Sequence, residues 1–204
     1  VPKKLFAYAS HFAKDFEDSR GFGWTVGEQS FNWEVLITNK NREISRLNGI
    51  YDTLLSNAGA TVIHGHAALQ DHHTITVGTE TYTSEHVVIA TGGWPFVPEI
   101  PGYEHAVTSN EAFFLKSLPR RVVIVGGGYI AVEFAGIFNG LGVDTTQVYR
   151  GPLFLRGFDD DLRSFLANEM GNNGIDLLFN TDITEIAVQD SSYRTMLDNG
   201  DSLE

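Results

Sequence analysis

The sequence contains no cysteine among its 204 residues, which excludes disulfide bonds, thiolate metal ligands and thiol chemistry within the chain. Basic residues are also scarce. The 14 Lys and Arg are outnumbered by 26 Asp and Glu, so the formal net charge is −12. Because nucleic acids and anionic membranes attract basic surfaces, both are poor partners for this chain.

Long hydrophobic runs are missing as well. No apolar stretch approaches the roughly 20 residues that span a bilayer, and the first residues do not resemble a secretory signal. We therefore expect a soluble, cytoplasmic protein. With 42% hydrophobic residues, the chain can form the core of one large domain or of two small ones.

The most informative stretch is an apolar run followed by glycines. Residues 122–125 read Val-Val-Ile-Val, which is typical of a buried parallel strand. In the sequence Gly-x-Gly-x-x-Ala that follows, Gly126 permits a sharp turn, Gly128 permits close approach of a phosphate, and Ala131 replaces the usual third glycine. The start of the next helix would offer free N–H groups to a dinucleotide pyrophosphate. A plain turn before a helix uses the same residues, so the motif alone leaves both interpretations open.

The residue after the second expected strand, 145–149, indicates which dinucleotide would bind. An NAD site needs a carboxylate there for the ribose 2′-OH, whereas a guanidinium suits the 2′-phosphate of NADP. This sequence has Arg150, and Arg156 could close on the same phosphate. The pattern favours NADP over NAD; the alternative is two ordinary surface arginines.

The other segments predict an α/β chain with a boundary in its middle. Two helices are expected over 2–20 and 32–57, followed by strands over 61–68, 73–77, 80–83 and 86–90, the last of them buried. A proline-rich crossing after residue 93 marks the domain boundary. Beyond it we expect a helix opened by a capping box at Thr108 and Glu111 and a third parallel strand over 175–179.

Two further expectations concern the last third of the chain. Aspartates 159–161 should open a helix whose inward residues are Leu162, Phe165, Leu166 and Met170. Residues 183–188 and 193–197 predict a hairpin, and Asp-Asn-Gly at 198–200 is a type I′ turn signal without a returning strand.

Several motifs, in order along the chain, match one known family. They are Val1-Pro2-Lys3-Lys4, Ser45-Arg46-Leu47-Asn48-x-Ile50-Tyr51, Gly65-His66-Ala67, Ile89-Ala90-Thr91-Gly92-Gly93 and Gly126-x-Gly128-Tyr129-Ile130-Ala131-Val132-Glu133. With them the chain resembles the FAD- and NADPH-dependent disulfide reductases of the glutathione reductase type. The resemblance implies a part of a Rossmann-like FAD domain with an antiparallel meander over 1–93. It also implies a Rossmann-like NADP-binding domain, incomplete at its C-terminal end, over 94–204.

The resemblance also implies roles for individual residues. Lys3 would lie beside the flavin and pair with Glu133, and Tyr129 would cover the nicotinamide pocket; these three are the expected catalytic residues. Tyr51 and Ile50 would face the substrate, oxidised glutathione. The expected cofactor-binding residues, for FAD and NADP together, are Lys3, Ala67, Thr91, Gly92, Gly126, Gly127, Gly128, Ile130, Ala131, Glu133, Arg150 and Arg156.

The sequence also departs from the family pattern. The first FAD-binding glycine motif and both redox cysteines are expected before Val1, and the second FAD-binding stretch and the interface domain of a homodimeric parent after Glu204. We therefore expect this chain alone to be catalytically inert. Alternatives are a trypanothione reductase-like enzyme, a dihydrolipoamide dehydrogenase-like enzyme, which Arg150 disfavours, and a stand-alone NADP-binding or interaction domain. The histidine pairs at 64 and 66 and at 72 and 73 lack carboxylate or thiolate partners, so no metal site is expected.

Overall fold

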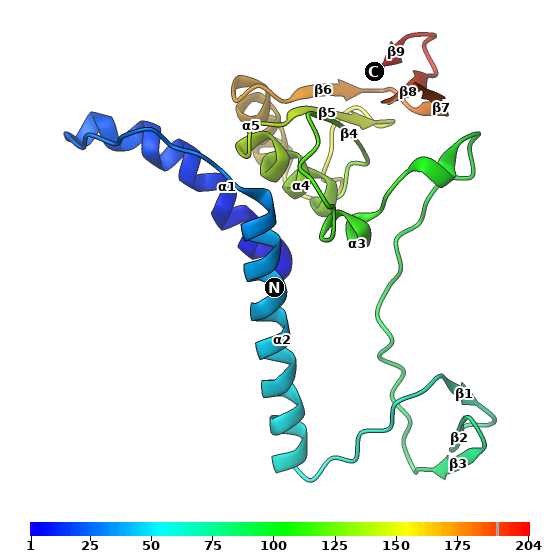
Figure 1. The fold of residues 1–204 in the computed structure, drawn as a ribbon. Helices are drawn as coiled ribbons and strands as arrows, with labels where there is room; N and C mark the ends of the chain where they lie inside the picture. Colours follow the sequence, from blue (N-terminus) through cyan, green and yellow to red (C-terminus); the bar gives the residue numbers. More distant parts are fainter. Residues whose placement is uncertain (191) are drawn as a thin grey trace. The chain divides into compact units, whose positions relative to one another are not determined.

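The computed structural model describes residues 1–190 and 192–204. The chain forms two compact units, one made of Val1–Ile44 with Phe96–Glu204 and the other of Ser45–Pro95. The second segment of the larger unit begins at Phe96, within the proline-rich crossing. The first 44 residues cluster with the C-terminal part of the chain, although the sequence grouped them with the segment up to residue 93. Figure 1 gives the order of the elements along the chain.

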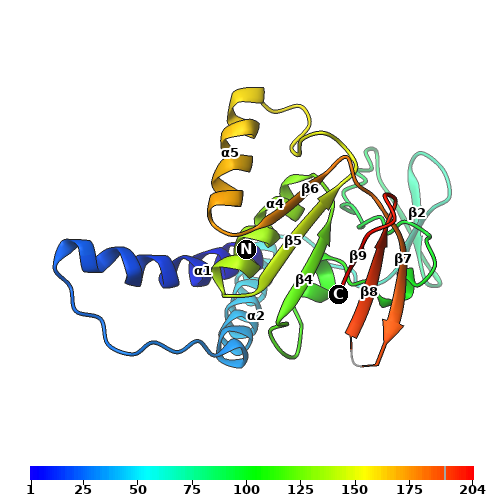
Figure 2. The ribbon, with the colours of Figure 1, turned by 90° about the horizontal axis from the view of Figure 1, so that it is seen from above.

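The larger unit is organised around a three-stranded parallel sheet. Its strands are β4 (Arg121–Val125), β5 (Asp144–Tyr149) and β6 (Asp176–Phe179), in the order β4-β5-β6 (Figure 2). Val125 is paired with Val148, and Tyr149 with Phe179. The three expected parallel strands are confirmed, and their carboxyl ends meet at one edge of the sheet.

Two helices connect these strands and cover the sheet. Helix α4 (Tyr129–Gly140) joins β4 to β5, and α5 (Asp160–Asn172) joins β5 to β6. Right-handed crossovers between strands in sequential order place both helices on the same face. One apolar cluster joins the two helices to the sheet, and its buried members are Val132, Ala135, Phe154, Met170 and Ile175.

The inward face of α5 differs from the expected one. Leu162 and Phe165 are each 66% exposed, whereas Leu166 and Met170 pack against the core as expected. The inward stripe continues one turn earlier to Arg163, whose side chain is only 14% exposed. The apolar periodicity of the sequence does not predict this inward face, because its first residue, Arg163, is charged.

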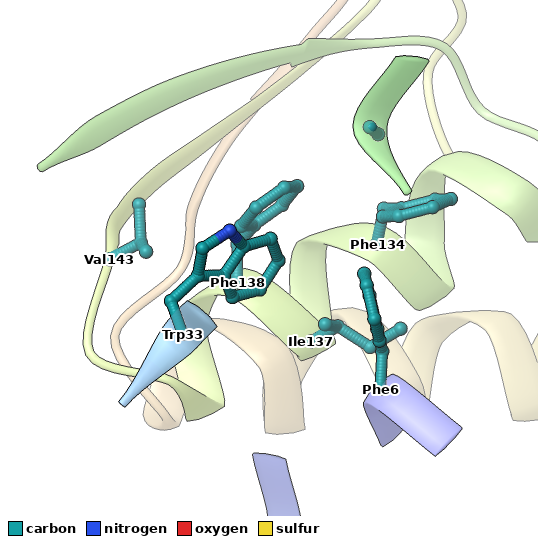
Figure 3. Close-up of a cluster of buried hydrophobic side chains, with 7 residues drawn as sticks. Phe6, Trp33, Phe134, Ile137, Phe138 and Val143 are labelled. Carbon is teal, nitrogen blue, oxygen red and sulfur yellow. The ribbon is translucent and has the colours of Figure 1, made fainter. Parts of the chain in front are cut away.

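A second core joins the N-terminal helices to α4. Helix α1 (Pro2–Ser19), the 3₁₀ turn η1 (Arg20–Phe22), α2 (Trp33–Asn57) and the short α3 (Ser109–Ala112) precede β4. Figure 3 shows side chains from α1, α2 and α4 meeting in this cluster. Its buried members are Phe6, Trp33, Ala112, Phe134, Ile137, Phe138 and Val143.

Only the N-terminal half of α1 contributes to this core. Phe6 is fully buried and packs edge-on against Trp33 at a ring separation of 5.2 Å. Phe12 and Phe16, two apolar residues further along the same helix, are exposed and stack on each other. The sequence predicted the extent of α1 correctly and overestimated the part of it that packs.

Two polar side chains of α2 bind the segment between α3 and β4. The indole N–H of Trp33 donates to the carbonyl of Leu115 at 2.7 Å, and the ammonium of Lys40 donates to the carbonyl of Phe113 at 2.8 Å. Lys40 also lies 4.0 Å from the centre of the Phe114 ring. Its burial lowers the pKa of Lys40 below the ordinary lysine value. The capping box of α3, with Thr108 and Glu111, is present as expected.

A second sheet ends the larger unit. Strands β7 (Ile183–Gln189), β8 (Ser192–Leu197) and β9 (Ser202–Leu203) are antiparallel in that order. The expectation that no strand returns after residue 200 is wrong, because Ser202 pairs with Met196. The turn is also not type I′, since Gly200 alone of its three residues has a positive φ, +90°.

The smaller unit contains an antiparallel meander of β1 (Ala67–Leu69), β2 (Thr74–Val77) and β3 (Glu80–Thr83). The second and third strands lie where they were expected, whereas of the strand expected over 61–68 only its last two residues belong to β1. The expected buried strand over 86–90 is not formed, and Val88 is 84% exposed. A buried strand needs neighbours on both sides, and no described strand pairs with this segment. Among the described residues, no helix is both long enough and apolar enough to cross a membrane.

Candidate functional site

The glycine turn lies at the carboxyl end of β4, directly before α4. Gly126 has a φ of +139°, a conformation that favours glycine, and its N–H donates to the carbonyl of Val148 on β5 at 2.9 Å. A Cβ added to Gly126 would lie 3.4 Å from that of Ala131, so these two positions pack closely, as the motif requires. Gly128 is the N-cap of α4, and a Cβ there would meet no atom within 4 Å.

These observations separate the roles of the glycines. The space beside Gly128 is open, and the first N–H groups of a 12-residue helix start there. Free helix N–H groups and the positive end of the helix dipole favour a phosphate at this position. The residues around Gly128 therefore fit a dinucleotide pyrophosphate.

Gly127 has a packing role that the sequence did not predict. A Cβ on Gly127 would approach the ring of Tyr149 to 2.6 Å, and one on Gly151 would approach the same ring equally closely. The Tyr149 side chain thus fills the space between the glycine turn and the segment after β5. In the sequence, the one indication of this arrangement is that the large aromatic residue Tyr149 stands two positions before Gly151.

A buried glutamine also supports the turn and was missed. Gln147 on β5 is 1% exposed, and its side-chain amide donates to the carbonyl of Gly126 at 2.9 Å. Its other polar atom, Oε1, is buried without a partner among the described residues. A buried amide donor that fixes one peptide of the turn restricts how the turn can reorient.

The two arginines expected at the 2′-phosphate lie on the same edge of the sheet as the glycine turn. Arg150 directly follows β5, whose carboxyl end lies beside that of β4. Arg156 lies in the loop to α5, next to Leu155, whose N–H donates to the carbonyl of Gly127 at 2.6 Å. Both side chains are exposed, so both guanidinium groups are open to an anionic ligand.

The three expected catalytic residues also meet. Lys3, in the first turn of α1, forms an ion pair with Glu133 on α4, across 130 positions of sequence. The Lys3 ammonium lies 4.5 Å from the centre of the Tyr129 ring, and Tyr129 is the first residue of α4. An ammonium, an aromatic ring and a carboxylate are therefore grouped near the start of α4, and the ring belongs to the residue directly after Gly128.

The packing of α1 on α4 brings these residues together. A Cβ added to Gly140 would lie 2.9 Å from both the Cβ and the carbonyl oxygen of Ser10, so the two helices touch closely there. Lys3 and Ser10 are seven positions apart, as are Glu133 and Gly140. From the first contact to the second, the residue number rises by seven on both helices. Helices α1 and α4 therefore run parallel, with their N-terminal ends side by side.

Ile130, also expected to bind the cofactor, is the second residue of α4 and is 41% exposed. The other expected site residues lie in the smaller unit. Tyr51 and Ile50 are exposed on α2, and Ala67 is exposed at the start of β1. Thr91 and Gly92 lie in an exposed irregular segment, where Gly92 has a φ of +74°. Their expected contacts with FAD and the disulfide substrate stay predictions. Within the described ranges, no three His, Asp or Glu side chains are grouped as metal ligands would be.

Comparison with known proteins places the whole chain in one family. The family model described as pyridine nucleotide-disulphide oxidoreductase matches residues 1–204. The chain is 46% identical to a glutathione reductase of Nostoc over 91% of its length, and 42% identical to a glutathione reductase of Burkholderia cepacia over its full length. It is also 40% identical to a trypanothione reductase of Leishmania donovani over 98% of its length. The chain spans only 40% to 45% of the length of these relatives.

Solved structures agree with the sequence relatives. The whole chain superposes on 44% of the flavoprotein disulfide reductase RclA from Escherichia coli, solved as a copper(II) complex, with a TM-score of 0.81 and 26% identity. The expected α/β fold class, a Rossmann-like flavoprotein arrangement, is thereby confirmed. By its sequence, its fold and its relatives, the chain belongs to the pyridine nucleotide-disulphide oxidoreductases, a family of oxidoreductases.

Proposed function

We propose that this chain is the nucleotide-binding part of an NADPH-dependent glutathione-disulfide reductase. The observation that carries the proposal is the cluster of Lys3, Glu133 and Tyr129 beside the open glycine turn. The cluster joins the start of α1 to the first turn of the helix that would bind the pyrophosphate. An ammonium held there by Glu133 on α4 is suited to stabilising negative charge that develops on a bound redox cofactor.

The two arginines support the choice of NADP. A guanidinium binds a phosphate through parallel charge-assisted hydrogen bonds, and a carboxylate at position 150 would repel it. In the proposed reaction the nicotinamide would supply a hydride and FAD would relay its electrons to a cysteine pair. That pair must come from outside these 204 residues, because the chain contains no cysteine.

The roles of the cluster follow from its chemistry. Tyr129 is 59% exposed at the start of α4, where its ring would shield the nicotinamide side of the site. The Lys3 ammonium would stabilise negative charge on a reduced flavin, and Glu133 would fix its position. The Lys3 side chain is 26% exposed and that of Glu133 is 51% exposed, so solvent screens the carboxylate more than the ammonium.

The substrate and the assembly rest on similarity alone. Oxidised glutathione is favoured because two of the relatives above are glutathione reductases, and trypanothione disulfide is the alternative that the Leishmania relative supports. Tyr51 and Ile50 would face this substrate, while Ala67, Thr91 and Gly92 would contact FAD. We also infer a cytoplasmic, homodimeric parent enzyme.

Retention on immobilised 2′,5′-ADP tests the nucleotide half of the proposal. The wild-type chain should be retained and should elute with free NADPH. Changing both Arg150 and Arg156 to Met should abolish retention, because the 2′-phosphate loses its charged donors. The matched control is Arg42→Gln, which removes an exposed arginine that donates to Asn39 on its own helix. Equal retention of the double variant and the control would refute the proposal.

The visible spectrum tests the flavin half. A purified chain that retains FAD absorbs in the visible, and a colourless chain shows that FAD requires segments beyond these 204 residues. We expect a colourless protein without glutathione-disulfide reductase activity, because the thiols of the proposed reaction are absent from the sequence. Measurable NADPH-driven reduction of oxidised glutathione by this chain would contradict that expectation.

A further inference from the structure

Arg163 is a cation on the buried face of α5. It shares that face with Leu166 and Met170, three and seven positions further along the helix, and its side chain is only 14% exposed. A guanidinium removed from water in this way must have its N–H groups satisfied by acceptors nearby.

Those acceptors belong mainly to the loop between β5 and α5. Nε of Arg163 donates to the carbonyl of Phe154 at 2.7 Å, and Nη2 donates to the carbonyl of Leu153 at 2.7 Å. Nη1 forms an ion pair with Asp160 in the first turn of α5. One planar group thus holds two successive backbone carbonyls, a geometry that the single ammonium of lysine cannot reproduce.

The same loop is also fixed to the glycine turn. Leu155 has a φ of +56°, which is rare for a leucine, and its N–H donates to the carbonyl of Gly127. Phe154, just before it, is fully buried and packs edge-on against Phe179 at a ring separation of 5.5 Å. An unfavourable backbone conformation persists only when its surroundings impose it. Here Leu155 is held by its own bond to the Gly127 carbonyl and by the bonds from Arg163 to the two residues before it.

Arg156 is the next residue along this loop. We propose that Arg163 is a positioning residue for nucleotide selectivity, because it fixes the loop backbone from which Arg156 reaches the 2′-phosphate. Arg163 does not touch the ligand itself; it acts through the carbonyls of Leu153 and Phe154. This inference rests on the proposed function, since it assumes that Arg156 binds the 2′-phosphate of NADP.

The test compares the dissociation constants of NADPH and NADH, measured by nucleotide fluorescence with the whole 204-residue chain. Compared with the wild type, the single variant Arg156→Met should show an about tenfold smaller preference for NADPH over NADH, as expected for the loss of one charge-assisted phosphate contact. Arg163→Gln should reduce the same preference by roughly three- to tenfold and leave the NADH affinity unchanged. Arg163→Lys should fall between Arg163→Gln and the wild type, and Arg42→Gln should match the wild type.

The double variant Arg156→Met with Arg163→Gln distinguishes positioning from a general structural role. If Arg163 acts through Arg156, the double variant shows no greater loss of preference than Arg156→Met alone. Additive losses, or equal weakening of NADPH and NADH by Arg163→Gln, would overturn the inference.

Two further outcomes separate this inference from the proposed function. If Arg156→Met leaves the preference intact, the assignment of Arg156 fails, and the role of Arg163 fails with it. If Arg156→Met acts as expected but Arg163→Gln does not, only the inference about Arg163 fails. If circular dichroism shows that Arg163→Gln has a much lower melting temperature than the wild type, Arg163→Lys replaces it in the test. A stably folded Arg163→Lys variant with the full NADPH preference of the wild type counts against the inference.

Discussion

At the scale of single residues, adjacent glycines of one turn have different roles. Gly127 touches the ring of Tyr149, whereas the space at Gly128 is open. The sequence alone treats the three glycines as one motif, because a motif does not record what each missing side chain would have met. The contacts of each glycine make the difference testable.

Gly127→Ala should lower the melting temperature, because the added Cβ would lie only 2.6 Å from the ring of Tyr149. Overpacking of this kind costs about 1–3 kcal/mol of unfolding free energy. Gly128→Ala is the matched variant and should melt like the wild type, but it should weaken NADPH binding by placing a methyl group where the pyrophosphate passes. The opposite pattern, with Gly128→Ala less stable than Gly127→Ala, would contradict these roles. Thermal denaturation and NADPH titration of both variants measure the difference.

Lys40 should make stability depend on pH in a defined direction. Burial lowers its pKa in the folded state, so between that lowered pKa and the ordinary value the unfolded chain binds more protons. The contribution of Lys40 to stability therefore rises as the pH increases through this window. Lys40→Met removes the titrating group, so the unfolding free energy of the wild type minus that of the variant should increase from pH 7 toward pH 10. Urea denaturation at several pH values measures it, and a decreasing difference would show that the assigned direction is wrong.

At the scale of elements, the contact between α1 and α4 assembles the site. Lys3 reaches Glu133 because the two helices run parallel and touch closely at Ser10 and Gly140. Helix extents were predictable from apolar spacing and from turn residues, but helix partners were not. Nothing local in the sequence states that residue 3 meets residue 133; the family resemblance supplied that pairing.

Two glycines of α4 provide a matched test of this contact. Gly140→Ala should destabilise the chain by roughly 1–3 kcal/mol, because its Cβ would lie 2.9 Å from the backbone of Ser10. Gly136→Ala, one turn earlier, meets nothing within 4 Å and should stabilise the helix by about 0.5–1 kcal/mol. Chemical denaturation measures the change in unfolding free energy of each variant. If Gly140→Ala stabilised the chain, the two helices would not touch there.

The errors at this scale have a common cause. Val88, Ile89, Leu162 and Phe165 were expected to be buried because they are apolar, yet the described structure leaves them exposed. Arg163 was overlooked because it is charged, yet it is largely buried. Sequence pattern predicts which side chains prefer burial, whereas the neighbours that are present decide which of them achieve it.

At the scale of the whole molecule, the chain carries much exposed apolar surface. Six large apolar residues are each at least 70% exposed, namely Phe22, Trp24, Val88, Ile89, Trp94 and Phe96. The relatives are more than twice as long as this chain, and their additional residues could cover equivalent positions. The family, the fold class and the strand–turn–helix at residues 121–140 were predictable from the order of the motifs, but the packing of this surface was not.

The exposed residues predict strong binding of a hydrophobic dye. Native chain mixed with anilinonaphthalene sulfonate should give a large fluorescence increase that disappears in urea, because unfolding disperses the apolar surface. Folded lysozyme provides a control without comparable exposure. A native chain that binds no more dye than this control would favour a closed, stand-alone nucleotide-binding domain.

The central claim is that the edge of the parallel sheet, with Gly128, Arg150 and Arg156, binds NADP in preference to NAD. The most direct test is the ratio of the dissociation constants of NADH and NADPH for the unmodified 204-residue chain, measured by calorimetry in one buffer. We predict that NADPH binds at least about tenfold more tightly, since a single charge-assisted contact to the 2′-phosphate contributes about that much. Equal affinity for the two nucleotides, or no binding of either, would contradict the account.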